Sequence, residues 1–105
     1  MKAKVVRYGK IGKVPLSPAV RAGDYIFISG QVPVGENNQL VKGGIEIQTE
    51  IVLNKIKTLL EQANSSLEDV IKTTVFLTNI DDFSAMNKVY QRFFLRNLQH
   101  VHVLK

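Results

Sequence analysis

The stretch that decides the fold runs from Val70 to Phe94 and reads VIKTTVFLTNIDDFSAMNKVYQRFF. In residues 70–77 the side chains alternate with the period of a strand, which predicts a β-strand with two distinct faces. One face carries Ile71, Thr73, Val75 and Leu77, and the other carries Val70, Lys72, Thr74 and Phe76. An acidic turn follows, in which Asp81 or Asp82 is expected to cap a helix.

The residues after this turn are apolar at helical spacing. The predicted buried face consists of Phe83, Met86, Tyr90, Phe93 and Phe94. An aromatic stripe of this kind is far more typical of a hydrophobic core than of a cofactor site. Strand, turn and helix therefore follow each other directly in the sequence.

A second helix is predicted over residues 45–63, after the Gly43–Gly44 break. Its apolar stripe consists of Val52, Ile56, Leu59, Leu60 and Ala63. Ser66 and Asp69 predict a single capped helical turn after it.

Strands are expected over residues 2–8 and 25–32, with a turn at 35–39 and a short return strand at 40–41. Residues 9–23 are expected to form a long loop, because Pro15 and Pro18 exclude regular pairing.

These elements predict a two-layer α+β sandwich in which both helices lie on one side of the sheet. The opposite sheet face also carries apolar side chains, with Phe76 and either Tyr25 or Phe27 as candidates. An uncovered apolar face of this kind favours self-association through the sheets.

The 105 residues fit one domain of ordinary composition, with 45% hydrophobic and 22% charged residues. There is no cysteine, which excludes disulfides and thiolate chemistry within this sequence. No apolar run approaches the length of a membrane span, and the basic N-terminus lacks the apolar core of a signal peptide. We therefore expect a cytoplasmic protein without membrane contact.

The net charge is +5, and both ends of the chain are basic. Such a charge is compatible with nucleic acids or anionic metabolites as partners. The basic residues are scattered, however, and aromatics do not interleave with them as a base-stacking surface requires. A solvated surface is the favoured interpretation, and a nucleic-acid partner is not expected.

Few residues mark a chemical site. His100 and His102 share one strand face, but a metal site requires three or four ligands, so we expect a polar strand face and no metal. Gly30, after Ser29, would let a ligand approach the backbone and accept a hydrogen bond from an amide. The alternative at this glycine is a β-bulge or tight packing, which spacing alone favours.

Three blocks of the chain resemble the RidA (YjgF-like) family of reactive imine and enamine deaminases. The blocks are PLSPAVRAGDYIFISGQVPV from Pro15, GGIEIQTEIVLNKIKTLLEQA from Gly43 and SLEDVIKTTVFLTNIDDFSAMNKVYQRFF from Ser66. The resemblance implies a chorismate-mutase-like α+β fold with a mixed sheet, forming a homotrimer with ligand clefts between subunits. It also implies cofactor-free hydrolysis of 2-imino acids, such as 2-iminopropionate and 2-iminobutyrate, to 2-keto acids and ammonia.

The resemblance assigns the substrate-binding residues unevenly. Ser29 and Gly30 match the family's Ser-Gly at the substrate carboxylate, and Asn87 matches an asparagine near the cleft. Leu16 stands where the family commonly has a tyrosine.

The chain departs from the family after Phe94. Val101 stands where the arginine that clamps the carboxylate is expected, and no residue stands in for the glutamate that orients water. Codons can be chosen for residues 97–105 so that a one-base shift encodes Pro-Pro-Ala-Arg-Ser-Cys-Ile-Lys, which is compatible with a frameshift.

We therefore expect a single RidA-like domain, residues 1–105, whose C-terminal strands are truncated or altered after about residue 94. The expected imine hydrolysis is weak or absent, and catalytic residues stay unassigned. Two alternatives remain open: a non-catalytic trimer that binds small carboxylates, and an RNA-binding relative of the translation-inhibitor type.

Overall fold

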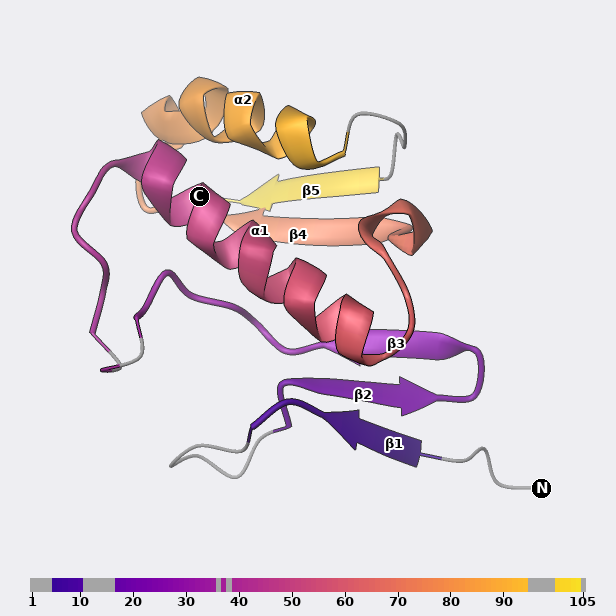
Figure 1. Cartoon of the computed structure of the whole chain (residues 1–105). Helices are drawn as coiled ribbons and strands as arrows, with labels where there is room; N and C mark the ends of the chain where they lie inside the picture. Colours follow the sequence, from indigo (N-terminus) through magenta and orange to yellow (C-terminus); the bar gives the residue numbers. More distant parts are fainter. Residues whose placement is uncertain (1–4, 11–16, 36, 38, 95–99, 105) are drawn as a thin grey trace.

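The computed structural model describes residues 5–10, 17–35, 37, 39–94 and 100–104, the last of these as backbone alone. Figure 1 shows the strands β1 to β5 and the helices α1 and α2. The strands are β1 (Val5–Tyr8), β2 (Ala19–Ala22), β3 (Tyr25–Ile28), β4 (Lys72–Phe76) and β5 (His100–Leu104). The helices are α1 (Ile45–Gln62) and α2 (Phe83–Phe93), and 3-10 turns lie at Leu67–Asp69 and Ile80–Asp82.

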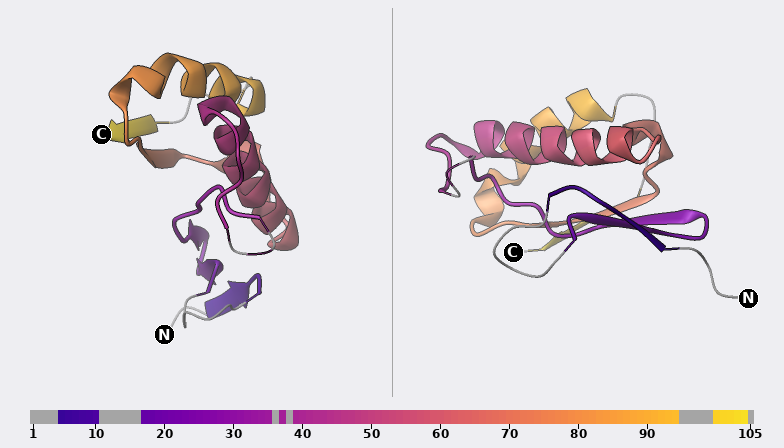
Figure 2. Two further views of the ribbon diagram at one scale, coloured as in Figure 1. Left: turned by 90° about the vertical axis from the view of Figure 1, so that its left-hand side faces the viewer. Right: turned by 60° about the horizontal axis from the view of Figure 1, so that its bottom comes forward.

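The strands form two separate sheets in the described part of the chain. The first is antiparallel in the order β1-β2-β3, and the second consists of β4 and β5 in parallel. Both helices lie on one side of the strands, as Figure 2 shows. The predicted α+β arrangement with both helices on one face is therefore confirmed, while the expected single mixed sheet is divided in two.

The expected long loop over residues 9–23 was wrong, because Ala19–Ala22 forms β2 and pairs with both β1 and β3. Pro18 is compatible with this strand, since it precedes the strand and its missing N–H removes no ladder bond. Its carbonyl accepts a hydrogen bond from the Ser29 N–H at 2.9 Å. Gly23, with φ of 62°, allows the two-residue turn that joins β2 to β3.

The hairpin expected around residues 35–39 is present in reduced form. Val34 and Leu40 form a single antiparallel bridge, and the Gly35 N–H donates to the Gln39 carbonyl at 2.9 Å. The strand expected to extend to residue 32 ends at Ile28.

Helix α1 confirms the predicted second helix, but its buried stripe is broader than the sequence indicated. Its buried residues are Thr49, Leu53, Leu59 and Leu60, followed by Ala63 just after the helix. Val52 and Ile56 of the predicted stripe are only half-buried. The predicted turn follows, and the Asp69 carboxylate accepts hydrogen bonds from the Ser65 hydroxyl at 2.8 Å and from the predicted Ser66 hydroxyl at 3.5 Å.

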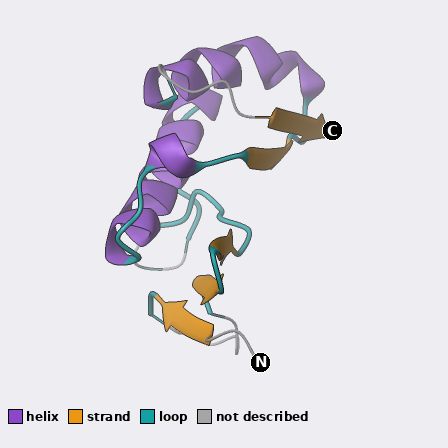
Figure 3. Cartoon of the chain, turned by 90° about the vertical axis from the view of Figure 1, so that its right-hand side faces the viewer, coloured by secondary structure: helices purple, strands orange, loops and turns teal. Residues whose placement is uncertain are grey.

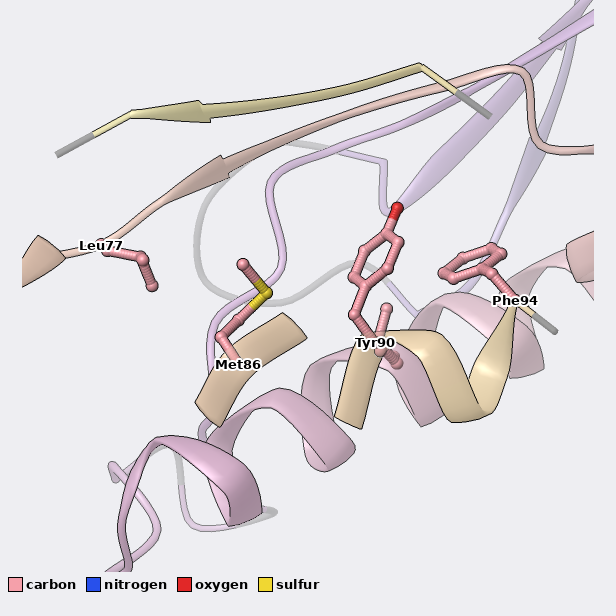
Figure 4. Close-up of a cluster of buried hydrophobic side chains, with 5 residues drawn as sticks. Leu77, Met86, Tyr90 and Phe94 are labelled. Atoms are coloured by element: carbon pink, nitrogen blue, oxygen red, sulfur yellow. The ribbon is translucent and has the colours of Figure 1, made fainter. Parts of the chain in front are cut away.

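The main core lies between α1, α2 and the end of β4, and Figure 4 shows its side chains. It consists of Leu53, Leu77, Met86, Tyr90 and Phe94. The Thr73 Oγ1 and the Tyr90 hydroxyl oxygen lie 2.6 Å apart and link β4 to α2 by a hydrogen bond. Tyr90 also stacks on Phe94, with ring centroids 4.6 Å apart.

The predicted inner and outer faces of β4 are confirmed from Lys72 to Leu77. Ile71, predicted on the inner face, points outward, and Val70, predicted on the outer face, packs inward. Ile71 is 72% exposed, whereas Val70 packs against the core. Both residues precede the strand, which begins at Lys72, so the strand's alternation does not govern them.

The start of α2 also differs from expectation. Asp82 occupies the N-cap position without a side-chain cap, while the Asn79 side chain accepts from the Asp81 N–H at 3.0 Å. Phe83, the first helical residue, is 41% exposed. The side-chain cap thus lies at Asn79, before the 3-10 turn Ile80–Asp82, and not at Asp81 or Asp82 as expected.

The outer sheet face is uncovered in the single chain, as predicted. Tyr25, Phe27 and Phe76 are exposed by 62%, 63% and 74%. No helix within the described residues is long and apolar enough to cross a membrane.

Candidate functional site

The residues that follow β3 are held in place by a set of short hydrogen bonds. The Ser29 N–H donates to the Pro18 carbonyl at 2.9 Å, and the Ser29 hydroxyl donates to the Ser17 carbonyl at 2.7 Å. Ser29 therefore fixes the end of β3 to the segment that precedes β2. Both of its hydrogens are engaged inside the protein.

Gly30 follows Ser29 in the chain and is exposed, and the packing around it does not require a glycine. A Cβ built on Gly30 would meet no heavy atom within 4 Å, and its φ lies outside the left-handed region. At Gly9, by contrast, a Cβ would approach Pro18 to 2.7 Å. The open space at Gly30 lets another molecule come close to the backbone.

The Gly30 amide lies just beyond the pairing of β3 with β2. In an antiparallel pair, the peptide groups of alternate residues face the partner strand. The Ser29 N–H donates to the Pro18 carbonyl, whereas Gly30 lies two residues beyond the end of β3 and is exposed. The Gly30 N–H makes no hydrogen bond to another described residue.

Two further bonds hold the backbone just after Gly30. The Gln31 side-chain amide donates to the Ser29 carbonyl at 3.0 Å, and the Lys55 ammonium of α1 donates to the Val32 carbonyl at 2.9 Å. The Gly30 amide is thus an available donor between two anchored residues, which is what a site for a small anion requires. Sequence reasoning missed Gln31 and Lys55, and no motif marks them.

The remaining predicted site residues lie elsewhere. Asn87 is a half-buried residue in α2, which packs against α1 above β4, whereas Ser29 and Gly30 follow a strand of the other sheet. The structure shows no hydrogen bond between Asn87 and either of them within its described part. Leu16 lies outside the described residues.

Residues 100–104 form β5, in parallel register with β4. Its His100, Val101 and His102 are paired with Lys72, Thr73 and Thr74, respectively. Across the described residues, no cluster of three or more His, Cys, Asp or Glu that could hold a metal ion occurs.

A separate open depression of about 360 Å³ lies between α1 and α2. Its lining residues are Glu50, Lys57, Leu67, Arg92 and Phe93, and none of the predicted site residues is among them. It has no sequence signature, because only tertiary packing brings together these residues of α1, α2 and the 3-10 turn at Leu67–Asp69.

The comparison with known proteins identifies the family. The family model described as endoribonuclease L-PSP matches residues 11–104. A RutC family protein of Pyrococcus abyssi is 46% identical over 81 residues, which cover 76% of this chain and 64% of that protein. The chain belongs to the RidA (YjgF, RutC) family.

Solved structures of RidA-family proteins support the fold. A crystal structure described as a putative endoribonuclease from Thermotoga maritima has a TM-score of 0.83 and 42% identity, covering 88% of this chain and 73% of that one. The crystal structure of RidA from Psychrobacter has a TM-score of 0.80 and 31% identity, covering 93% and 78%. The chain therefore has the YjgF/chorismate-mutase-like α+β fold, and it spans 64% of the length of its Pyrococcus relative.

Proposed function

We propose that the chain binds the carboxylate of small 2-imino or 2-keto acids at the Gly30 amide, in a RidA-type cleft completed by other copies in a homotrimer. The observation that carries this proposal is the N–H of the exposed Gly30, which makes no hydrogen bond to another described residue and lies between the anchored Ser29 and Val32. A backbone amide held this way donates to an anion without first having to be ordered.

The chemistry asked of such a site is modest. Water adds to the carbon of a protonated imine to give a carbinolamine, which collapses to a 2-keto acid and ammonium. The imine carbon is already electrophilic, so orientation of the substrate and stabilisation of its charge supply the acceleration. No thiol or other covalent nucleophile is needed, in keeping with a sequence that has no cysteine.

Ser29 has a positioning role in this proposal. The Ser29 hydroxyl donates a hydrogen bond to the Ser17 carbonyl. The Ser29 Oγ can therefore accept a further hydrogen bond but has no hydrogen left to donate to a carboxylate. The Gly30 N–H is then the group that meets the carboxylate. Asn87 reaches the ligand from α2, on the assumption that the cleft is built between copies.

The position of Val101 leads us to propose weak turnover. An arginine would grip a carboxylate through two parallel hydrogen bonds, and valine has no donor in its side chain. Imine hydrolysis by this chain is therefore expected to be slow or absent even where a 2-keto acid binds.

Two variants of Gly30 separate the role of its N–H from that of its missing side chain. Gly30→Pro removes the N–H, whereas Gly30→Ala keeps it and adds only a methyl group in open space. Calorimetric titration with 2-ketobutyrate should show binding by the original chain and by Gly30→Ala, and at least about tenfold weaker binding by Gly30→Pro, since a hydrogen bond to a charged group contributes about 1.5–3 kcal/mol.

Circular dichroism and unfolding curves for both variants are the control for folding. Equal binding by Gly30→Pro and the original chain would contradict the proposed donor. A coupled assay of 2-iminopropionate hydrolysis tests the weak turnover, and a rate matching that of the Psychrobacter protein would refute it.

RNA binding remains a second candidate, favoured by the description of the matching family model as an endoribonuclease and by the net charge of +5. The described residues include no paired general acid and base at the Ser29–Gly30 segment. Retention on an RNA column that falls steeply between 50 and 200 mM salt would support this candidate.

A further inference from the structure

The open depression beside α1 and α2 combines two kinds of lining. Lys57 of α1 and Arg92 of α2 bring positive charge, while Leu67 and Phe93 bring apolar surface. Figure 3 shows the 3-10 turn that contains Leu67 below α2, on the segment that leads from the end of α1 to β4. Three segments that are separate in the sequence therefore meet at one hollow of about 360 Å³.

The two cations of the depression keep their donors available. Both side chains are exposed, and neither Lys57 nor Arg92 makes a side-chain hydrogen bond or an ion pair with another described residue. Lys55, on the same helix, differs in this respect, because its ammonium donates to the Val32 carbonyl at 2.9 Å. Lys57 and Arg92 can therefore bind an anion without giving up a contact inside the protein.

The remaining lining residue, Glu50, limits the charge of a ligand. It lies seven residues before Lys57 in α1 (57 − 50), which separates the two backbone positions by about 10 Å along the helix axis. Two cations and one carboxylate give the lining a formal charge of +1. A monoanion balances this charge, whereas a dianion would exceed it and would be repelled by Glu50.

Leu67 and Phe93 form an apolar wall beside these charges. Both side chains are half-buried and pack against the hydrophobic core, so they are held in place while part of their surface stays accessible. An aromatic ring of a ligand can pack against the Phe93 ring, which is favourable beyond the burial of apolar area. A ligand needs this apolar contact, because an ion pair with exposed side chains contributes little by itself.

We propose that the depression is a second binding site, which takes small aromatic monocarboxylates. The carboxylate lies on Lys57 and Arg92, and the ring lies against Leu67 and Phe93. The Arg92 guanidinium can offer two parallel N–H donors to the two carboxylate oxygens, and the Lys57 ammonium adds a second cation. The volume of about 360 Å³ falls within the range of small-molecule sites, which is about 300–1,000 Å³.

This site is distinct from the one proposed at Gly30. None of its lining residues belongs to the segment after β3. A small 2-keto acid such as 2-ketobutyrate has no ring to place against Phe93, so the depression favours acids with a larger apolar body.

Calorimetric titration with 3-phenylpropionate, a carboxylate joined to a benzene ring, tests the site. The original chain should show saturable binding. The double variant Lys57→Met/Arg92→Met keeps much of the side-chain volume and removes both cations, so it should bind at least about tenfold more weakly. The matched control is Lys88→Met, which removes an exposed cation of α2 outside the lining and should leave the affinity unchanged.

The neutral amide 3-phenylpropionamide separates the contribution of the charge from that of the ring, and it should bind at least about tenfold more weakly than the acid. An NMR titration of the ¹⁵N-labelled chain locates the ligand. 3-Phenylpropionate should shift the amides of Lys57, Leu67 and Phe93, and Gly30→Pro should bind it as tightly as the original chain does.

Three results would overturn the second site. These are the absence of saturable binding at millimolar 3-phenylpropionate, equal affinity in the double variant and the original chain, and shifts that gather at Gly30 instead of the depression. Because none of these readouts uses a 2-keto or 2-imino acid, failure of the carboxylate site at Gly30 would leave this test intact.

Discussion

Arg21 shows how one side chain couples a strand to a helix. Its guanidinium donates to the Ala63 carbonyl at 2.7 Å and to the Tyr8 hydroxyl at 3.4 Å. The Ala63 carbonyl is one of the acceptors that the end of an α-helix leaves without a partner in the helix. A cation at this end also interacts favourably with the helix dipole.

Replacing this cation tests its contribution. Arg21→Met keeps much of the side-chain volume and removes every donor, so the free energy of unfolding should fall by about 2 kcal/mol. Arg7→Met is the control, because Arg7 is exposed on β1. Urea unfolding curves should show a change within about 0.5 kcal/mol for the control. Equal losses in the two variants would contradict the assigned role.

At the scale of elements, β4 and α2 are joined by a polar contact inside an apolar core. The Thr73–Tyr90 hydrogen bond connects the inner face of β4 to the buried side of α2. Thr73→Val keeps the shape and removes the hydroxyl, which should destabilise the fold by about 1–2 kcal/mol. Thr74→Val, on the exposed face of the same strand, should change stability by less than about 0.5 kcal/mol.

A double-mutant cycle with Tyr90→Phe measures the coupling itself. The variant with both changes should be more stable than the sum of the two single losses predicts. Each single change removes one hydroxyl and leaves the other without this hydrogen bond, whereas the double change removes both hydroxyls. Strict additivity would show that the two hydroxyls act independently.

The elements also show how far the sequence predicts the fold. Helix α2 and the faces of β4 were predictable, because their apolar residues recur at the regular period of a helix or a strand. Strand β2 was missed because it has four residues and follows a proline, which is an ambiguous signal for pairing. At the site, the resemblance to the RidA family marked Ser29 and Gly30, whereas spacing alone favoured a β-bulge or tight packing at Gly30. The bond from Lys55 to Val32 joins residues 23 apart in sequence, and only tertiary packing creates it.

At the scale of the whole molecule, the uncovered aromatic face predicts self-association. Burial of each ring at an interface between copies contributes about 2 kcal/mol, which corresponds to about a thirtyfold change in the dissociation constant. Phe27→Thr and Phe76→Thr should each weaken assembly by about this factor in sedimentation equilibrium. Phe83→Thr, at the start of α2 and away from the sheet face, is the control.

A trimer that dissociates in Phe27→Thr and Phe76→Thr, with a lower average mass, and that persists in Phe83→Thr would support a RidA-type assembly. A chain that sediments as a monomer at all concentrations would refute the proposal that its cleft is completed by other copies.

The most direct test of the carboxylate site is an NMR titration of the uniformly ¹⁵N-labelled chain with 2-ketobutyrate. The Gly30 amide should show one of the largest, saturable shifts, with smaller effects at its anchored neighbours Ser29 and Gln31. A titration that leaves Gly30 unmoved, and instead shifts Lys57 and Arg92 in the depression between the helices, would contradict the account.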